Sequence, residues 1–137
     1  MNRALIRHGF ILMLLGLLGG FLIPNMAIPR LGLSAHTIGI LGGVLLIALG
    51  AVWAQFRLGT RQSALMYWSW LYANYINWLG CLIGAITGAG RMTPVVAAGQ
   101  EGGEAAEWVV AAMLISVGIA SLIAVGLSLW GLRGQGD

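Results

Sequence analysis

Polar side chains interrupt an otherwise apolar stretch, WLYANYINWLGC, at residues 70–81. They are two amides and two phenols: Asn74, Asn77, Tyr72 and Tyr75. An amide left in hydrocarbon without a partner costs several kcal/mol, so such residues face a neighbouring helix or a cavity. In a cavity they can hydrogen-bond and orient a small polar ligand.

Helical spacing groups these side chains. Asn74 and Asn77 are three residues apart and Asn74 and Trp78 are four apart, so the three share one helix face. Tyr72 and Tyr75 flank that face. The spacing fits two interpretations: amides that hold neighbouring helices together, or a stripe that lines a cavity.

The composition is that of a membrane protein. Of 137 residues, 59% are hydrophobic and 8% are charged, whereas a soluble domain has roughly 25% charged residues. Lipid must therefore cover the apolar residues. The basic residues are seven arginines without a lysine, too few and too scattered for a nucleic-acid surface, so we expect no nucleic-acid partner.

Four apolar segments can each cross a bilayer as a helix, for which about 20 residues suffice. They cover about residues 4–23, 33–56, 63–89 and 105–132. Pro24, Asn25 and Pro29 mark the first break, RLGTR (57–61) the second and a glycine-rich segment (88–104) the third. These features predict one all-α integral membrane domain over residues 1–137, built as a four-helix transmembrane bundle.

The arginines predict the orientation of this bundle. One side has Arg3, Arg7, Arg57, Arg61 and Arg133, and the other has Arg30 and Arg91. Because cytoplasmic loops carry the excess of arginine, both termini are expected in the cytoplasm.

The expected depth of each histidine in the membrane shows which of them can lie near the polar stripe of the third segment. At 1.5 Å per residue, Asn74 lies roughly 16 Å and Trp78 roughly 23 Å from the cytoplasmic end of the third segment, and His36 lies roughly 5 Å below the outer surface. His36 therefore shares the outer layer with the stripe. There it is either capped by a hydroxyl, from Ser34 or Thr37, or ligates something. His8 lies at the cytoplasmic end, where we expect an interfacial histidine beside Arg7.

Glycines at four-residue spacing form stripes on three segments. They are Gly16 and Gly20, Gly39 and Gly43, and Gly80, Gly84 and Gly88. Such stripes let helix backbones approach closely. We expect packing within one protomer; the alternative is an interface between subunits.

Familiar catalytic motifs are absent from the sequence. It has no paired carboxylates inside a span, no Ser/His/Asp set, no zinc-ligand spacing and no phosphate loop. We also expect no acid inside a span, which disfavours an ion-coupled transporter.

Five segments, in order, closely resemble hydroxylaminobenzene mutases: RHGFILMLLGLLGG (7–20), NMAIPRLGLSAHTIGILGG (25–43), LGAVW (49–53), YANYINWLG (72–80) and LSLWGLR (127–133). PRLGLSAH and YANYINWL are the most specific. That family isomerises aryl hydroxylamines to aminophenols in bacterial nitroarene breakdown. It is similar to the membrane-bound styrene oxide isomerases, which are four-helix homotrimers using haem b.

The resemblance also assigns residues. His36 matches the histidine that ligates haem iron in the isomerases, and Asn74 matches an asparagine of their pocket. Trp78 stands where they have a catalytic tyrosine and Gly42 where they have a second asparagine; these departures count against epoxide isomerisation. Arg30 and Arg91 are the cations available for haem propionates, although anchoring at the lipid interface explains them equally.

The resemblance thus implies a multi-pass isomerase of the bacterial inner (cytoplasmic) membrane that converts hydroxylaminobenzene, a small aromatic hydroxylamine, to 2-aminophenol. It implies ferric haem b on His36 as Lewis acid and a homotrimer in the lipid bilayer. The candidate catalytic residues are Asn74, Asn77, Trp78 and Tyr72. Alternatives are a haem-binding electron-transfer subunit, an epoxide isomerase, and a small transporter or structural subunit.

Overall fold

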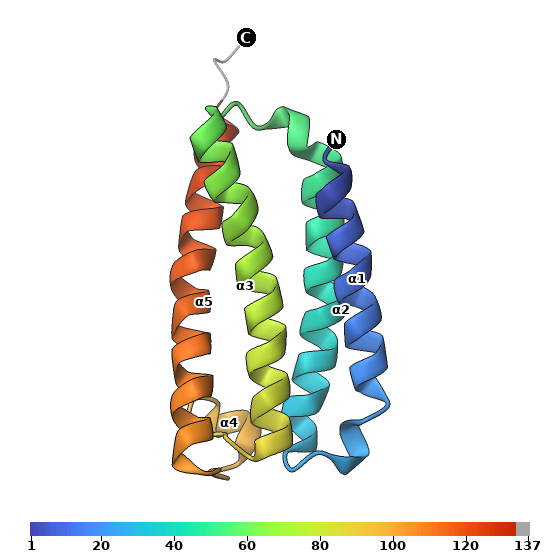
Figure 1. Ribbon diagram of the computed structural model, residues 1–137, viewed down its shortest axis with the longest axis vertical. Helices are drawn as coiled ribbons and strands as arrows, with labels where there is room; N and C mark the ends of the chain where they lie inside the picture. The colour runs from blue at the N-terminus through green and yellow to red at the C-terminus, as the bar shows by residue number, and fades with distance from the viewer. Residues whose placement is uncertain (134–137) are drawn as a thin grey trace.

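The four apolar segments form four long helices in the computed structural model, which describes residues 1–133 (Figure 1). These residues contain no strand. The long helices are α1 (Arg3–Gly20), α2 (Pro29–Val52), α3 (Thr60–Thr87) and α5 (Glu104–Gly131). The connections contain a short helix, α4 (Pro94–Ala97), and two 3-10 turns, η1 (Ile23–Asn25) and η2 (Trp53–Gln55).

Local chemistry sets the helix ends. The Asn2 side chain accepts hydrogen bonds from the backbone of Ala4 and Leu5 and caps α1. The second helix begins at Pro29, four residues before the predicted start, because proline is favoured in the first turn of a helix. The third ends before Gly88, whose φ of 79° lies in the left-handed region that glycine tolerates.

Consecutive long helices run antiparallel, so their ends meet in two groups (Figure 1). At one end, Asn2 N donates to Gly50 O at 2.7 Å and Arg57 N donates to Gly131 O at 2.8 Å. These bonds join the start of α1 to the end of α2, and the α2–α3 connection to the end of α5. The five arginines predicted for one side lie at this end, and Arg30 and Arg91 lie at the other.

Glycines bring α1 and α2 into backbone contact. A Cβ placed on Gly39 would lie 2.7 Å from the Cα of Gly16, and one on Gly43 would lie 2.6 Å from the carbonyl oxygen of Gly9. Neither position has room for a side chain. Packing within one protomer is therefore confirmed for Gly16, Gly39 and Gly43.

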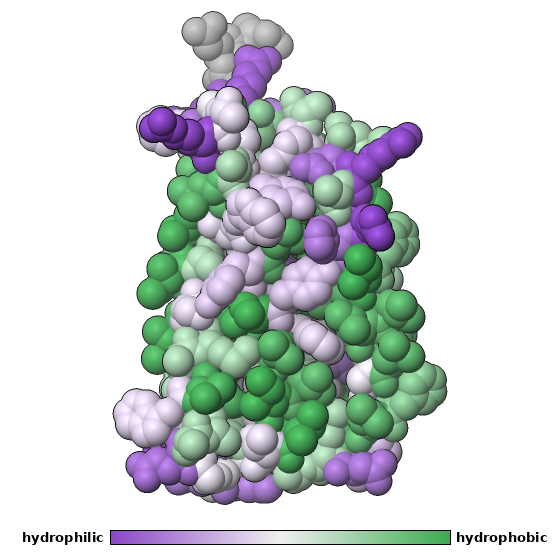
Figure 2. Space-filling view, viewed as in Figure 1, coloured by the Kyte–Doolittle hydropathy of each residue, from purple (hydrophilic) through white to green (hydrophobic). Residues whose placement is uncertain are grey.

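The exterior of the bundle is apolar. Many large hydrophobic side chains are exposed, with Phe21 at 81% and Leu122 at 78%. Hydrophilic residues gather toward the two ends of the molecule, with apolar surface on the sides between them (Figure 2). An apolar belt of this extent is suited to lipid rather than water.

Hydropathy distinguishes α3 from the other long helices. Within residues 1–133, three helical segments are long and apolar enough to cross a membrane: Arg3–Gly20, Pro29–Gln55 and Glu104–Gly131. By this measure the third predicted span is not among them, although α3 has 28 residues. It contains Asn74, Asn77 and all three tyrosines of the chain, which lower its hydropathy.

Replacing Gly43 by alanine tests the backbone contact. We expect Gly43→Ala to destabilise the protein by about 1–3 kcal/mol, because its methyl group would meet the Gly9 carbonyl. Gly118→Ala, on α5, is the matched control, since a Cβ there has nothing within 4 Å. Thermal unfolding in a mild detergent should show a lower melting temperature only for Gly43→Ala. Equal melting temperatures would contradict the close packing of α1 and α2.

Candidate functional site

His36 is held by a backbone carbonyl of the neighbouring helix. Its Nδ1 lies 2.8 Å from the carbonyl oxygen of Gly16. A carbonyl only accepts, so Nδ1 carries the proton and donates. In the neutral ring the lone pair is then on Nε2, and no residue in the range 1–133 hydrogen-bonds that atom.

Neither hydroxyl near His36 caps its ring. Ser34 and Thr37 each donate to a carbonyl one turn earlier in their own helix, at 3.1 and 3.0 Å. Of the two interpretations that the sequence left open, the hydroxyl cap is thus wrong. The remaining one, a histidine whose free nitrogen binds a ligand, stays a prediction.

The His36 ring lines a groove of about 520 Å³ on the outside of the α1–α2 pair. Its other lining residues are Leu14, Leu17, Leu18, Gly20, Phe21, Ile23 and Leu33. Gly20 leaves room for the imidazole, because a Cβ there would lie 2.7 Å from Nδ1. The groove thus combines one acceptor nitrogen with apolar walls, which suits a largely apolar ligand.

Asn74 and Trp78 lie in the layers next to His36 but inside the bundle. A Cβ added to Gly39 would lie 3.1 Å from the Trp78 ring, and a Cβ added to Gly42 would lie 2.6 Å from Asn74 Oδ1. Asn74 Nδ2 donates to Trp70 O at 2.8 Å. The two side chains therefore meet α2 at its glycines, and neither lines the His36 groove.

Asn77 and Tyr72 make different contacts from that pair. Asn77 Oδ1 lies 4.0 Å from Cys81 Sγ, one turn along α3. Tyr72 is 45% exposed, and its hydroxyl is 2.8 Å from Ser116 Oγ on α5. Tyr72 thus contacts α5, whereas Asn74 and Trp78 contact α2.

The two candidate cations differ in their surroundings. Arg30 lines a cleft with Leu33, which also lines the His36 groove. Arg91 forms an exposed ion pair with Glu101 at 3.2 Å. Arg30 is therefore the nearer of the two to His36. Residues 1–133 contain no group of three His, Cys, Asp or Glu side chains that could hold a metal ion.

Comparison with known proteins now gives the family. The sequence model of the styrene oxide isomerase family matches residues 1–133. The chain belongs to the styrene oxide isomerase family.

Two relatives come from Ectopseudomonas oleovorans. Hydroxylaminobenzene mutase HabB is 46% identical over 132 residues, which are 96% of this chain and 80% of HabB. Hydroxylaminobenzene mutase HabA is 37% identical over 100 residues, which are 73% of this chain and 74% of HabA. No solved structure matches the chain.

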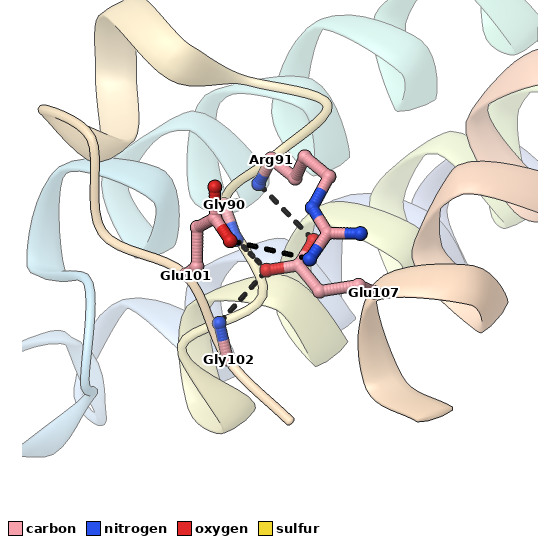
Figure 3. Close-up of polar contacts among 5 residues, drawn as sticks. All are labelled: Gly90, Arg91, Glu101, Gly102 and Glu107. Atoms are coloured by element: carbon pink, nitrogen blue, oxygen red, sulfur yellow. Dashed lines mark hydrogen bonds and ion pairs between the residues drawn. The ribbon is translucent and has the colours of Figure 1, made fainter. Parts of the chain in front are cut away.

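This member of the styrene oxide isomerase family has a buried carboxylate that we did not expect. Glu107, in the first turn of α5, is 2% exposed. It accepts hydrogen bonds from the backbone N–H groups of Gly90, Arg91 and Gly102, at 3.1, 3.1 and 2.8 Å (Figure 3). The expectation of no acid inside a span stays a prediction, because Glu107 lies in the first turn of α5 and contacts the loop before it. The glycine-rich segment (88–104) folds back and supplies the N–H donors. In the sequence, the feature that could have indicated this contact is an acid in the first helical turn after such a loop.

The partner of His8 was also missed. His8 Nδ1 lies 3.1 Å from the Tyr75 hydroxyl, which in turn donates to the backbone oxygen of His8 at 3.2 Å. The rings meet edge to face, with centroids 5.8 Å apart. Because the two residues are 67 positions apart, no local pattern indicates this contact.

Glu107→Gln should loosen the connection between α3 and α5 in this family member. The amide keeps one oxygen and turns an NH₂ group toward a backbone N–H, so we expect a lower melting temperature. Hydrogen exchange at the Gly90, Arg91 and Gly102 amides should accelerate. Glu104→Gln, exposed in the same helical turn, should change stability by less than about 0.5 kcal/mol. Unchanged hydrogen exchange of these amides in Glu107→Gln would show that the carboxylate does not hold the loop in place.

Proposed function

We propose that this chain is a membrane-bound isomerase, an intramolecular mutase that converts hydroxylaminobenzene to 2-aminophenol. The observation that carries the proposal is the 46% identity, over 96% of the chain, to a relative named for that substrate. The family match over residues 1–133 supports the same isomerase class.

The reaction balances within one molecule. The N–O bond breaks, a C–O bond forms at the ortho carbon, that carbon loses its proton and the nitrogen gains one. Substrate and product are isomers, so no external oxidant or reductant is needed. The protein must assist departure of oxygen from nitrogen and hold that oxygen beside the ring.

Side chains of α3 offer the orienting groups. Asn74 donates one amide hydrogen to the Trp70 carbonyl, and this bond holds the side chain in place. Its Oδ1 and remaining N–H can bind the NHOH group, and the Trp78 ring provides a flat wall for the arene. Tyr72 precedes Asn74 in α3 and Asn77 precedes Trp78, and both would act on the margins of such a pocket.

The His36 groove fits the haem b that the resemblance implies. The Gly16 carbonyl holds the proton on Nδ1, which leaves the lone pair of Nε2 as a ligand. Apolar walls suit a porphyrin, and Arg30 is the cation beside the groove for propionates. Bound there, haem would supply a Lewis-acidic iron.

The bundle is proposed to span the bacterial inner membrane four times, with both termini in the cytoplasm. In support, α3 is as long as α5, at 28 residues, and lies against both α2 and α5. The Asn74 amide meets α2 and the Tyr75 hydroxyl meets α1, so these two polar groups need not meet lipid. The five arginines at one end and two at the other support the orientation.

We also propose a homotrimer, because the site is incomplete in one chain. The His36 groove opens to the outside, whereas Asn74 and Trp78 lie within the bundle. A neighbouring copy could close the groove and contribute polar side chains. The mass of the protein in a mild detergent tests this, and a fully active monomer would contradict it.

His36 is the first residue to test. Membranes containing the protein should convert hydroxylaminobenzene to 2-aminophenol without added cofactor, and His36→Ala should abolish both this activity and any haem absorption. Thr87→Val is a control, because the Thr87 hydroxyl only donates to Ile83 O in its own helix. Full activity in His36→Ala membranes would refute the assigned role of this residue.

Asn74 and Asn77 separate a catalytic role from a packing role. If they orient the NHOH group, Asn→Leu at either position should reduce turnover by about ten-fold or more, most severely at Asn74. If they only join helices, turnover per folded protein should persist, because intramembrane hydrogen bonds average about 0.6 kcal/mol. Turnover and melting temperature must be measured on the same preparations. A stable and fully active Asn74→Leu rules out the catalytic role.

A further inference from the structure

A second groove lies between α1 and α3, toward the end of the bundle where the chain begins. It has a volume of about 300 Å³ and is lined by His8, Trp68, Leu71, Tyr72, Tyr75 and Ile76. It shares no lining residue with the His36 groove. Residues of intermediate hydropathy gather over this part of α3 on the face shown in Figure 2.

The Tyr75 hydroxyl lies close to both the ring and the backbone oxygen of His8. The backbone oxygen of His8 can only accept, so the single Tyr75 hydroxyl proton is donated to it, at 3.2 Å. The contact of 3.1 Å between Tyr75 Oη and His8 Nδ1 is then a hydrogen bond only if Nδ1 carries a proton. In that tautomer the lone pair is on Nε2, which has no hydrogen-bond partner in the described part of the chain.

Size and walls limit what can occupy this groove. A cavity of about 150 Å³ with apolar walls already holds benzene, so 300 Å³ is ample for one aromatic ring. Trp68, Tyr72 and Tyr75 offer ring faces and edges to such a molecule. The unpartnered Nε2 acceptor favours a ligand that brings an O–H or N–H donor.

We propose that this groove is a second binding site, for one-ring aromatic molecules that carry a hydroxyl or hydroxylamine group. His8 Nε2 accepts the donor hydrogen, and the aromatic side chains hold the ring. Hydroxylaminobenzene and 2-aminophenol both belong to this class. A role in holding substrate or product on its way through the membrane therefore rests on the proposed function, whereas the binding itself does not.

Nitrogen-15 NMR of labelled histidine can test the site directly, because the chain contains only two histidines. The probes are phenol and anisole, which share a ring but differ in the donor hydrogen. In the full-length protein, His8 should be protonated on Nδ1. Phenol should shift its Nε2 signal and bind about five-fold more tightly than anisole, the factor given by a hydrogen bond of about 1 kcal/mol.

Three variants sharpen the test. His8→Phe keeps a ring but removes the acceptor, so phenol should bind about five-fold more weakly while anisole is unaffected. Tyr75→Phe removes the hydroxyl that holds the His8 proton on Nδ1, and the ring should then populate both tautomers. In His36→Ala the single remaining histidine signal must still respond to phenol, which separates this site from the proposed active site.

Several results would overturn the proposal: a His8 ring protonated on Nε2, equal affinities for phenol and anisole, or a phenol response confined to His36. If His8→Phe fails to fold, the tautomer and the two probe titrations on the unaltered chain still decide. These readouts do not depend on turnover. A chain that lacks mutase activity can therefore still pass this test, and an active mutase can fail it.

Discussion

Close approach of α1 and α2 is the constraint on which the arrangement of the site depends. The Gly16–Gly39 contact brings a carbonyl of α1 to 2.8 Å from the His36 ring, and thereby determines which nitrogen is free. A Cβ on Gly16 would lie 3.0 Å from the Gly39 Cα, so even a methyl group would press the helices apart. Helical glycines cost about 1 kcal/mol each in conformational freedom. In lipid, little hydrophobic force joins the helices, so they are held together mainly by close backbone packing. This packing offsets the conformational cost of the glycines.

The same glycines make room for α3. Gly42 has no side chain where Asn74 Oδ1 approaches, and Gly39 faces Trp78 as well as Gly16. By resemblance, related isomerases carry an asparagine at the position of Gly42. In this chain the amide that reaches the junction comes from α3 instead. The absence of a side chain on Gly42 is therefore what lets the Asn74 amide approach α2.

Sequence alone indicated those parts of the fold that depend on local chemistry and average polarity. The apolar segments predicted the helices, and Pro29 and Gly88 lie at boundaries for reasons that a sequence displays. The spacing of Asn74 and Trp78 correctly put them on one face of α3. What could not be predicted depends on distant segments meeting: Tyr75 bonding His8 across the bundle, and the loop amides that surround Glu107. The amide stripe was likewise open to two interpretations, because spacing does not tell whether a neighbouring helix has a side chain or a glycine.

The two histidines differ from the buried polar side chains, which all have hydrogen-bond partners. Among the described residues, no buried side-chain nitrogen or oxygen lacks a hydrogen-bond partner, as expected where water is scarce. Nδ1 of each histidine lies within hydrogen-bond distance of a group on another helix, and each histidine lines a groove. A donor hydrogen on a molecule that enters the groove from the membrane would satisfy a lone pair in such a place. Because small arenes with one polar group dissolve in bilayers, grooves that open sideways let them bind without first passing through water.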